Sequence, residues 1–513
     1  MVSTVYSAGL SGVDGFEVTV ECSGFDRLPN FELVGLPDAA VKEATERVRS
    51  ACENSGIRFP ALDMMVNLAP AHLKKEGSGF DLAILCSILQ CAGIIPKNKD
   101  LSDVCMIGEL SLSGEIRGIN GVLCMALAAR DAGKKYLYVP AANASEAGVV
   151  DGLTVYPLRH LRELLDHLAG KIDIEPVRYD MQEFVTGSHQ YAEDFSDVRG
   201  QEVAKRALEI AAAGGHNILL IGPPGSGKSM LAKRIPSILP DMTFEEALET
   251  TKVHSVMGLL KNHLVCNRPF RAPHHSVSNV GMIGGGANPR PGEISLAHNG
   301  VLFLDEMPEL PKTVSEALRQ PLEDGRVTVI RAAARVTFPG RFMLVGAMNP
   351  CRCGYFGDPN HACTCTENEV RRYLDRVSGP MLDRMDIQTE VPAVSYEEIS
   401  GKHPKGETSA TIRARVNAAR AFARARLAKN GEAPVTNAAM SVSQLRRYCV
   451  LDEAAESILS AAFTNLGLSA RGHDRILRVA RTIADLEGCE TIGAMHIAEA
   501  INYRSLDRKY WKR

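Results

Sequence analysis

The sequence predicts a mixed α/β protein in three parts: an α+β N-terminal domain, a core with a parallel sheet, and an all-helical C-terminal domain. Three observations predict this fold class. Short strands such as "FEVTVEC" mix with helices in the first part of the chain. Apolar strands ("HNILLIG", "GVLFLDE", "FMLVGAMN") then alternate with helices, a pattern typical of a parallel sheet covered by helices. The last part is rich in Arg and helical, beginning with "TIRARVNAARAFARARLAK".

The length of 513 residues suits about three domains of ~100–200 residues each. We place the N-terminal domain at residues 1–172 and the core at residues 195–395. Between them, residues 173–194 include most of the polar stretch "YDMQEFVTGSHQYAEDFSD" and are predicted to form a linker. The helical domain takes residues 396–513.

The composition is that of an ordinary globular protein, 45% hydrophobic with one Trp. No run of ~18 apolar residues predicts a membrane span. The N-terminus "MVSTVYSAGLSGVDGF" lacks the basic region and apolar core of a signal peptide. We therefore expect a cytoplasmic protein, whose 13 cysteines do not form a disulfide framework.

The net charge of −3 is unevenly distributed along the chain. Residues 1–170 carry 15 Lys and Arg against 21 Asp and Glu, whereas residues 400–513 carry 19 against 11. Two interpretations stay open for the basic C-terminal part. It binds nucleic acid, or it docks on the acidic surface of another subunit.

The stretch "ILLIGPPGSGKSML" fits the phosphate-binding pattern G-x-x-x-x-G-K-[ST] between a strand and a helix. Gly225 and Gly227 allow backbone N–H groups to approach phosphates, and a helix N-terminus favours the anion. Lys228 is predicted to reach the β- and γ-phosphates of ATP, and Ser229 to hold Mg²⁺. The predicted nucleotide-binding residues of this loop are Gly222, Pro223, Pro224, Gly225, Ser226, Gly227, Lys228 and Ser229.

Acidic and amide side chains follow the next two apolar strands. Asp305 and Glu306 end "GVLFLDE", 76 residues after Ser229. Asp305 is predicted to bind Mg²⁺, and Glu306 to orient and deprotonate the attacking water. Asn349 ends "FMLVGAMN" and is predicted to help position that water; the alternative is a turn cap.

Four cysteines gather directly after Asn349 in "NPCRCGYFGDPNHACTCTENE". Cys351, Cys353, Cys363 and Cys365 form the pattern C-x-C-x9-C-x-C within an insertion at residues 351–365. Four thiolates complete the tetrahedral shell of a structural Zn²⁺. Reduced, unliganded thiols and redox chemistry are the alternatives, and His361 is a substitute for one thiolate. We expect this insertion to contact DNA or a neighbouring subunit.

Together these motifs resemble the magnesium-chelatase-like group of AAA+ ATPases, and among them the YifB/ComM family, over essentially the whole chain. "FRAPHHSVSNVGMIGGGANPRPGEISLAHNGVLFLDEMPEL" and "ALRQPLEDGRVTVIRAAARVTFPGRFMLVGAMNPCRCG" are similar to that family's signatures. The resemblance implies that Arg384, in "LDRMD", is the arginine finger of a neighbouring site. It also implies that Arg471, in "SAR", is the sensor-2 arginine of a helical lid. Such ATPases form rings, usually hexamers, and a site completed by the next subunit makes hydrolysis depend on assembly.

The N-terminal part resembles the Lon-type proteolytic fold through "LSGEIRGINGVLCMALAARDAGKKYLYVPAAN". Lon enzymes use a Ser nucleophile and a Lys. In the matching loop "KEGSGFD", Gly79 stands at the nucleophile position, with Ser78 one place early, and Leu123 stands at the Lys position. Ser78 paired with Lys74 or Lys75 is the remaining alternative. We therefore expect a non-proteolytic domain that serves assembly or DNA contact.

Two insertions are predicted to be exposed, "RPFRAPHHSVSNVGMIGGGANPRPGE" and "DGRVTVIRAAARVTFPGR". The resemblance implies that they line the pore of a ring. We expect Arg side chains there either to bind DNA phosphates without reading the base sequence or to form ion pairs between subunits. For His274 and His275 we favour a packing or pore role over a metal site. The arginines concerned are Arg268, Arg271, Arg290, Arg326, Arg331, Arg335 and Arg341.

The resemblance implies a ring-forming, ATP-dependent DNA motor with ATP, Mg²⁺ and a structural Zn²⁺. It is expected to drive branch migration on single-stranded or branched DNA, without sequence preference, in natural transformation or homologous recombination. The alternative is a magnesium-chelatase-type ATPase that remodels a partner protein, against which the Lon-like extension argues. A protease is disfavoured by the missing Ser–Lys pair, and a nucleotide switch by the presence of Glu306 and Arg384.

Overall fold

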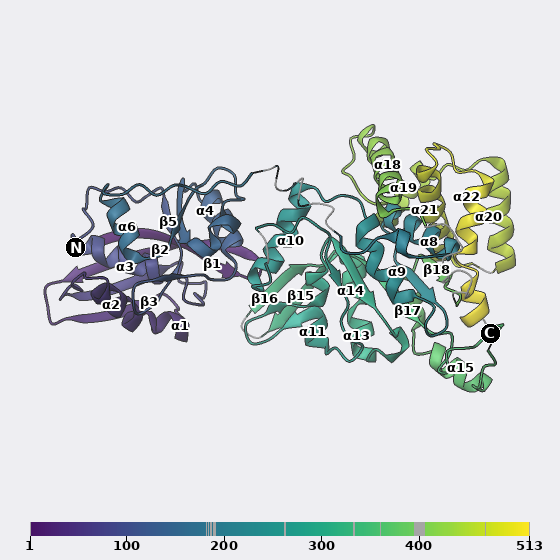
Figure 1. Cartoon of the computed structure of the whole chain (residues 1–513), viewed down its shortest axis with the longest axis horizontal. Helices are drawn as coiled ribbons and strands as arrows, with labels where there is room; N and C mark the ends of the chain where they lie inside the picture. The colour runs from purple at the N-terminus through teal and green to yellow at the C-terminus, as the bar shows by residue number, and fades with distance from the viewer. Residues whose placement is uncertain are drawn as a thin grey trace. The chain divides into compact units, whose positions relative to one another are not determined.

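The computed structural model describes two compact units (Figure 1). The first unit combines residues 1–187 with residues 244–266, and the second combines the two remaining stretches, 188–243 and 267–513. Parts of the predicted linker and the first ten residues of the predicted helical domain lie outside the described residues. The described residues are 2–180, 182, 184, 187, 191–260, 263–331, 334–359, 361–393, 406–466 and 468–511.

The first unit is built on a seven-stranded sheet in the order β3-β4-β2-β1-β5-β8-β9. Its centre is antiparallel, from β4 through β2 to β1, and the strands added on either side are parallel to their neighbours. In β2, buried Val18, Val20 and Cys22 alternate with more exposed residues, as expected where one face packs on the core. The strands are β1 (Val2–Ser11), β2 (Asp14–Phe25), β3 (Asn30–Val34), β4 (Asp63–Ala69), β5 (Val104–Met106), β8 (Tyr136–Pro140) and β9 (Thr154–Leu158), with a separate pair β6 (Glu109–Leu110) and β7 (Ile116–Arg117).

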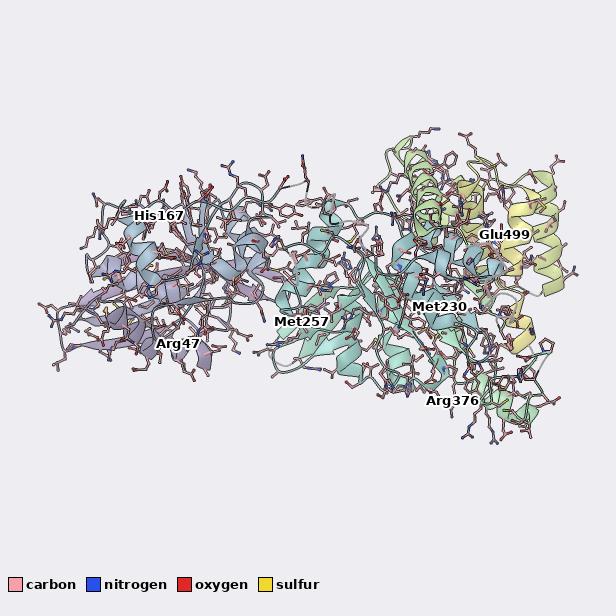
Figure 2. All side chains as sticks on the ribbon, viewed as in Figure 1. Arg47, His167, Met230, Met257, Arg376 and Glu499 are labelled. Atoms are coloured by element: carbon pink, nitrogen blue, oxygen red, sulfur yellow. The ribbon has the colours of Figure 1, made fainter. Side chains whose placement is uncertain are left out.

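Helix α3 is buried along its whole length in this unit. Its first residue, Asp81, pairs with Arg47 of α2 at 2.9 Å, which neutralises a buried carboxylate at the start of the helix. Figure 2 labels Arg47 in this unit. The helices of the unit are α1 (Ala39–Lys42), α2 (Ala44–Asn54), α3 (Asp81–Cys91), α4 (Val122–Asp131), α5 (Ala144–Ala147), α6 (Leu161–Leu168) and α10 (Phe244–Val256).

Helix α10 joins this unit although it follows the phosphate-binding loop in sequence. It packs on α4, where the Gly121 N–H donates to the carbonyl of Ser255 at 3.1 Å and Lys252 pairs with Asp14 at 3.1 Å. Leu248 adds apolar contact to the core around α4. Residues 244–266, which lie inside the predicted core, therefore fold with the first unit.

The second unit contains a five-stranded sheet in the order β11-β14-β17-β10-β18, with every pair parallel. This confirms the predicted parallel sheet. Strands β10 and β14 are buried at every residue, as expected for a sheet covered on both faces. The strands are β10 (Ile218–Ile221), β11 (Phe270–Arg271), β14 (Gly300–Leu304), β17 (Phe342–Met348) and β18 (Ile387–Glu390).

Short elements surround this sheet. Two small antiparallel pairs, β12 with β13 and β15 with β16, lie in the two arginine-containing insertions. The helices and extra strands are α8 (Glu202–Gly214), α9 (Lys228–Arg234), α11 (Asn279–Ile283), β12 (Gly284–Gly285), β13 (Arg290–Pro291), α12 (Glu293–Leu296), α13 (Lys312–Ala317), α14 (Arg319–Asp324), β15 (Arg326–Arg331), β16 (Ala334–Pro339), α15 (Glu367–Leu374) and α16 (Gly379–Leu382).

The C-terminal part is helical, as predicted, and its helices lie together in green to yellow in Figure 1. Helices α18 and α21 pack on α8. Arg481 is fully buried and pairs with Asp485 at 3.0 Å, and Arg426 pairs with the same carboxylate at 2.5 Å. None of the helices that the structure describes is long and apolar enough to cross a membrane. The helices are α18 (Ser409–Ala428), α19 (Val442–Tyr448), α20 (Glu453–Leu466), α21 (Ala470–Leu486) and α22 (Ala494–Asn502).

Replacing Asp485 by Asn is expected to lower the thermal midpoint by at least about 5 °C. The buried guanidinium group of Arg481 and the half-buried one of Arg426 lose their counter-charge, which costs about 3 kcal/mol or more. Scanning calorimetry measures the midpoint. Glu453→Gln, at an exposed position of α20, is the control and is expected to leave the midpoint within about 1 °C. Equal midpoints for both variants would contradict the stabilising role of Asp485.

Candidate functional site

The sheet of the second unit brings three loops to one edge. Strand β17 lies between β10 and β14, and all three run in the same direction. The phosphate-binding loop follows β10, Asp305 and Glu306 follow β14, and Asn349 follows β17. In open α/β sheets, ligands bind at the carboxyl ends of the strands.

The phosphate-binding loop depends on its glycines in two ways. Gly225 and Gly227 have φ angles of +76° and +90°, which side chains rarely adopt. At Gly222 the reason is space, because a Cβ there would lie 2.1 Å from the carbonyl oxygen of Val391. Gln201 supports the loop from outside by donating from Nε2 to the carbonyl of Ser226 at 2.5 Å.

Lys228 is buried at the centre of this site, with 8% of its surface exposed. Its Nζ donates to the carbonyls of Gly222 at 2.8 Å and Pro223 at 2.9 Å, and to Asn349 Oδ1 at 3.2 Å. Burial lowers the pKa of the ammonium, and the nearby Asp305 carboxylate opposes that shift. Phosphate oxygens are stronger, charged partners for this group, so the site is suited to an anion.

Ser229 and Asp305 are in direct contact. The Ser229 hydroxyl donates to Asp305 Oδ2 at 2.7 Å, and the other carboxylate oxygen accepts from the Glu306 N–H at 2.9 Å. A hydroxyl and a carboxylate side by side match the oxygen ligands that Mg²⁺ prefers. The two residues predicted to hold Mg²⁺ therefore lie together and fit the ion.

Glu306 has a φ of +49°, an uncommon conformation for a residue with a side chain. Its carboxylate is half-exposed and lies 2.9 Å from Nδ1 of His275, in the loop after β11. This pair was missed by the sequence analysis, which gave His275 only a packing or pore role. The sequence carries no local signal for it, because Glu306 follows His275 by 31 residues and the contact depends on how two loops approach each other.

The two arginines implied by the family resemblance contact other groups. Arg384 pairs with Glu323 of α14 and donates to the carbonyl of Pro380 at 2.6 Å. Arg471 has 81% of its side chain exposed and lies 3.9 Å from Asp383. Arg475, one turn further along α21, is buried and shares the same Asp383 at 3.5 Å.

The structure thus gathers five predicted residues and leaves two apart. The two apart, Arg384 and Arg471, make no hydrogen bond to the phosphate-binding loop within the described part of the chain. The other five form one connected set: hydrogen bonds join Lys228 to Asn349, and Ser229 to Asp305 and Glu306, and the peptide bond between Lys228 and Ser229 links the two groups.

The arginines of the two insertions fall into different environments. Arg271 forms a bidentate ion pair with Glu293, at 2.7 and 2.8 Å, so it stabilises its own chain. Arg268 donates to the carbonyl of Asn299 at 2.7 Å. The other five are exposed, namely Arg290, Arg341 and, on the β15–β16 hairpin, Arg326, Arg331 and Arg335. These exposed arginines are placed to meet a ligand in solvent.

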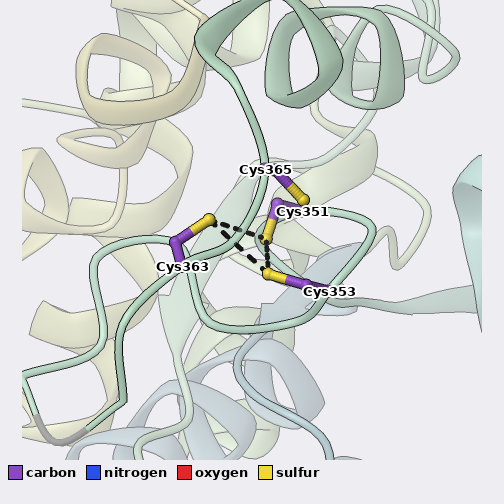
Figure 3. Close-up of side chains that lie close together, drawn as sticks. All are labelled: Cys351, Cys353, Cys363 and Cys365. Atoms are coloured by element: carbon purple, nitrogen blue, oxygen red, sulfur yellow. Dashed lines mark hydrogen bonds between the residues drawn. The ribbon is translucent and has the colours of Figure 1, made fainter.

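The four cysteines meet in space (Figure 3). The Sγ atom of Cys351 lies 3.3 Å from that of Cys353 and 3.7 Å from that of Cys363, and all four sulfurs lie within 4.8 Å of one another. Zinc with bonds of about 2.3 Å to a tetrahedron of thiolates needs sulfur separations of about 3.8 Å. The cluster fits this ion.

Other features of the cluster agree with metal binding. Burial raises the pKa of the Cys353 thiol, but the nearby Tyr355 N–H and Cys351 thiol lower this pKa overall, and the same sulfur contacts raise the pKa of Cys363. His361, the predicted substitute ligand, instead stacks on Tyr355 with ring centroids 4.9 Å apart. The donor set is therefore four sulfurs.

The purified protein is expected to carry about one zinc ion per chain. Cys351→Ser with Cys363→Ser removes two of four ligands and is expected to abolish this zinc. Inductively coupled plasma mass spectrometry measures the metal content. Cys266→Ser, at a half-buried cysteine outside the cluster, is the control and is expected to retain the ion. Equal zinc in both variants would rule the cluster out as its site.

The parallel sheet with a phosphate-binding loop, an acidic pair and a helical C-terminal part is typical of an AAA+ protein. Family models agree. "Magnesium chelatase, subunit ChlI" matches residues 194–399, "Subunit ChlI of Mg-chelatase" matches residues 18–143, and "Magnesium chelatase, subunit ChlI C-terminal" matches residues 406–504.

Curated relatives narrow the assignment. The chain is 43% identical to the uncharacterized protein YifB of Escherichia coli K12 and to the competence protein ComM of Haemophilus influenzae. Both alignments cover 99% of this chain and 98% of the relative. Identity to the magnesium-chelatase 38 kDa subunit of Cereibacter sphaeroides is 26%, over 59% of this chain and 88% of that protein. The chain belongs to the YifB/ComM family of magnesium-chelatase-like proteins.

Proposed function

We propose that this protein is an ATPase that assembles into a ring, with six chains as the expected number, and moves DNA. As a ComM-like motor it drives branch migration of recombination intermediates, in natural transformation or homologous recombination. The observation that carries the ATPase proposal is the connected set Lys228–Asn349 and Ser229–Asp305–Glu306 at one edge of a parallel sheet. The full-length similarity to a competence protein supports the DNA role.

In the proposed reaction the Lys228 ammonium changes its hydrogen-bond partners when ATP binds. The phosphates replace the carbonyls of Gly222 and Pro223 around the Lys228 ammonium. Ser229 and Asp305 hold Mg²⁺, which neutralises phosphate charge when bound. Glu306 accepts a proton from the attacking water, and the amide of Asn349 orients that water.

Assembly completes the proposed site. The helical C-terminal part acts as the lid, in which Arg471 is the proposed sensor-2 residue. Arg384, bound to Glu323 within its own chain, is proposed to contact the γ-phosphate held by the next subunit. A cation supplied by a neighbour stabilises the charge of the transition state and links hydrolysis to ring formation.

The proposed DNA contacts are electrostatic. Arg326, Arg331 and Arg335 are exposed on the β15–β16 hairpin, where they are available to bind backbone phosphates. Contacts of this kind fix DNA in a channel but do not read its sequence, which suits a motor that acts on any branched substrate.

We propose that the first unit is a Lon-type domain without proteolytic activity that serves assembly or DNA contact. Its side chains support this. The Ser78 hydroxyl is bound to Glu109, and the fully buried Lys75 ammonium is bound to the carbonyl of Pro70. Burial lowers the pKa of Lys75. The two groups therefore have separate partners instead of forming a nucleophile–base pair.

The second candidate is a magnesium-chelatase-type ATPase that remodels a partner protein. The family models favour it, because their descriptions name chelatase subunits over all three matched regions, including residues 18–143 of the first unit. The expectation that chelatase subunits lack the N-terminal extension is therefore a weak argument against this second candidate. The magnesium-chelatase 38 kDa relatives align with only 59% of this chain, so the comparison does not choose between the two functions. The dependence of ATP hydrolysis on DNA distinguishes them.

Glu306→Gln is expected to keep ATP binding but to lower hydrolysis at least about 100-fold, because the amide does not accept the water proton. Wild-type hydrolysis is expected to rise with branched DNA, and strand exchange on a synthetic four-way junction to stop in the variant. Glu309 lies three residues further on and pairs with Arg376 at the surface, so Glu309→Gln is the control. Wild-type hydrolysis that is indifferent to every DNA would favour the partner-remodelling function.

His275→Ala is expected to raise hydrolysis without DNA, by about fivefold at most, because it frees Glu306 from a half-exposed pair worth about 1 kcal/mol or less. A steady-state phosphate-release assay measures the rate. His274→Ala, whose side chain contacts Ser276 at 2.7 Å, is the control. A lower rate in His275→Ala would show that the histidine supports the active position of Glu306.

A further inference from the structure

The four-cysteine cluster lies against the phosphate-binding loop. A Cβ added at Gly354 would lie 2.4 Å from Cδ and 2.7 Å from Cγ of Pro224. The Gly354 N–H donates to the carbonyl of Cys351 at 3.0 Å, so this glycine belongs to the turn that presents the first two thiols. The proline ring therefore packs on the backbone of the cluster, with no room for a side chain between them.

The same segment is tied to the end of β17. Cys351 is fully buried and follows Asn349 by two residues. After the cluster the chain forms α15, whose Tyr373 hydroxyl lies near the backbone of Asn349. Asn349, whose amide oxygen accepts from Lys228, therefore lies close to the start of the insertion and to the helix that follows it.

The end of the chain packs on the outer side of this insertion. Phe356 lies 6.3 Å from the ring of Tyr510, and Trp511 Nε1 donates to the carbonyl of Leu374 at 3.3 Å. The Tyr510 hydroxyl donates to Glu390 at 2.6 Å, at the end of β18. Figure 1 shows α15 beside the C-terminus. The insertion therefore contacts both the chain end and the phosphate-binding loop.

We propose that the zinc-loaded cluster is a positioning element for nucleotide binding: it holds Pro224 through Gly354 and thereby fixes the phosphate-binding loop. This inference rests on the proposed ATPase function and on zinc binding by the four cysteines. Between residues 351 and 359 the structure describes turns and bends but no helix or strand. In this proposal a bound zinc ion fixes the shape of that segment. Loss of zinc frees the surface on which Pro224 packs, and nucleotide affinity falls.

The cluster contains a matched pair of glycines for testing this role. Gly354 and Gly357 have φ angles of +91° and +78°, so an alanine strains the backbone similarly at both. Only Gly354 faces the phosphate-binding loop, since a Cβ at Gly357 would meet nothing nearer than Lys509 Cε, at 3.9 Å. Comparing the two alanine variants isolates the contact with Pro224 from general strain.

The test measures zinc content and the Kd of a fluorescent ATP analogue, with Mg²⁺, by anisotropy. Gly354→Ala is expected to keep zinc and to bind the analogue about tenfold more weakly than Gly357→Ala, because overpacking displaces Pro224. If Gly354→Ala also loses zinc, Pro224→Ala removes the contact from the other side and is expected to weaken binding with zinc retained. Equal affinity of zinc-loaded Pro224→Ala and wild type overturns the proposal.

Removing the metal tests the same role independently. Wild type stripped with a strong chelator is expected to bind the analogue at least about tenfold more weakly and to recover when Zn²⁺ is restored. Unchanged affinity of the zinc-free protein overturns the proposal. A failure of the ATPase function itself looks different, because the zinc-loaded wild type would then not bind the analogue at all.

Discussion

The buried Lys228 ammonium is the group on which the candidate site depends. Desolvation disfavours its charge, and the carbonyls of Gly222 and Pro223 together with Asn349 compensate. Those partners lie directly after two adjacent strands, so the ammonium has all three hydrogen bonds only when β10 and β17 are correctly paired. The same arrangement offers an anion a stronger set of contacts than the carbonyls provide.

The parallel sheet extends this constraint to the other loops. Because β17 separates β10 from β14, Asn349 lies between the phosphate-binding loop and the acidic pair. The cysteine cluster follows Asn349 directly in sequence, and the chain end packs beside it through Tyr510 and Phe356. The contact of His275 with Glu306 lies within the site, and the proposed zinc and the proposed lid helices lie further from it. In the proposed motor, these are the points through which hydrolysis would be coupled to the movement of a partner molecule.

The sequence predicted the parts of the site that follow from local pattern. Lys228, Asp305 and Asn349 each come directly after an apolar strand, and the ends of parallel neighbours meet at one edge, so the strand pattern was enough to bring them together. The four cysteines were predictable for a similar reason, since their spacing within one loop limits how far apart they lie.

Other features depend on contacts between segments that are far apart in the sequence, and no local sequence pattern predicts them. Helix α10 has an ordinary helical pattern, and only the surface of α4 that receives it explains why residues 244–266 fold with the first unit. The proximity of Gly354 to Pro224 depends on how two loops approach, which neither loop encodes alone. The sequence of α21 contains several arginines and does not show that Arg471 is exposed whereas Arg475 is buried. That difference depends on the contacts with Asp383, which comes from another part of the chain.

The most direct test of the proposed ring ATPase is a mixing experiment with two inactive variants. Lys228→Ala lacks the phosphate-binding cation, and Arg384→Ala lacks the group proposed to act on the neighbouring site. Mixed before assembly, they are expected to regain part of the wild-type ATP hydrolysis, because an Arg384→Ala chain keeps its own Lys228 and receives Arg384 from its neighbour. No regained hydrolysis in mixtures that are shown to co-assemble would contradict a site shared between subunits.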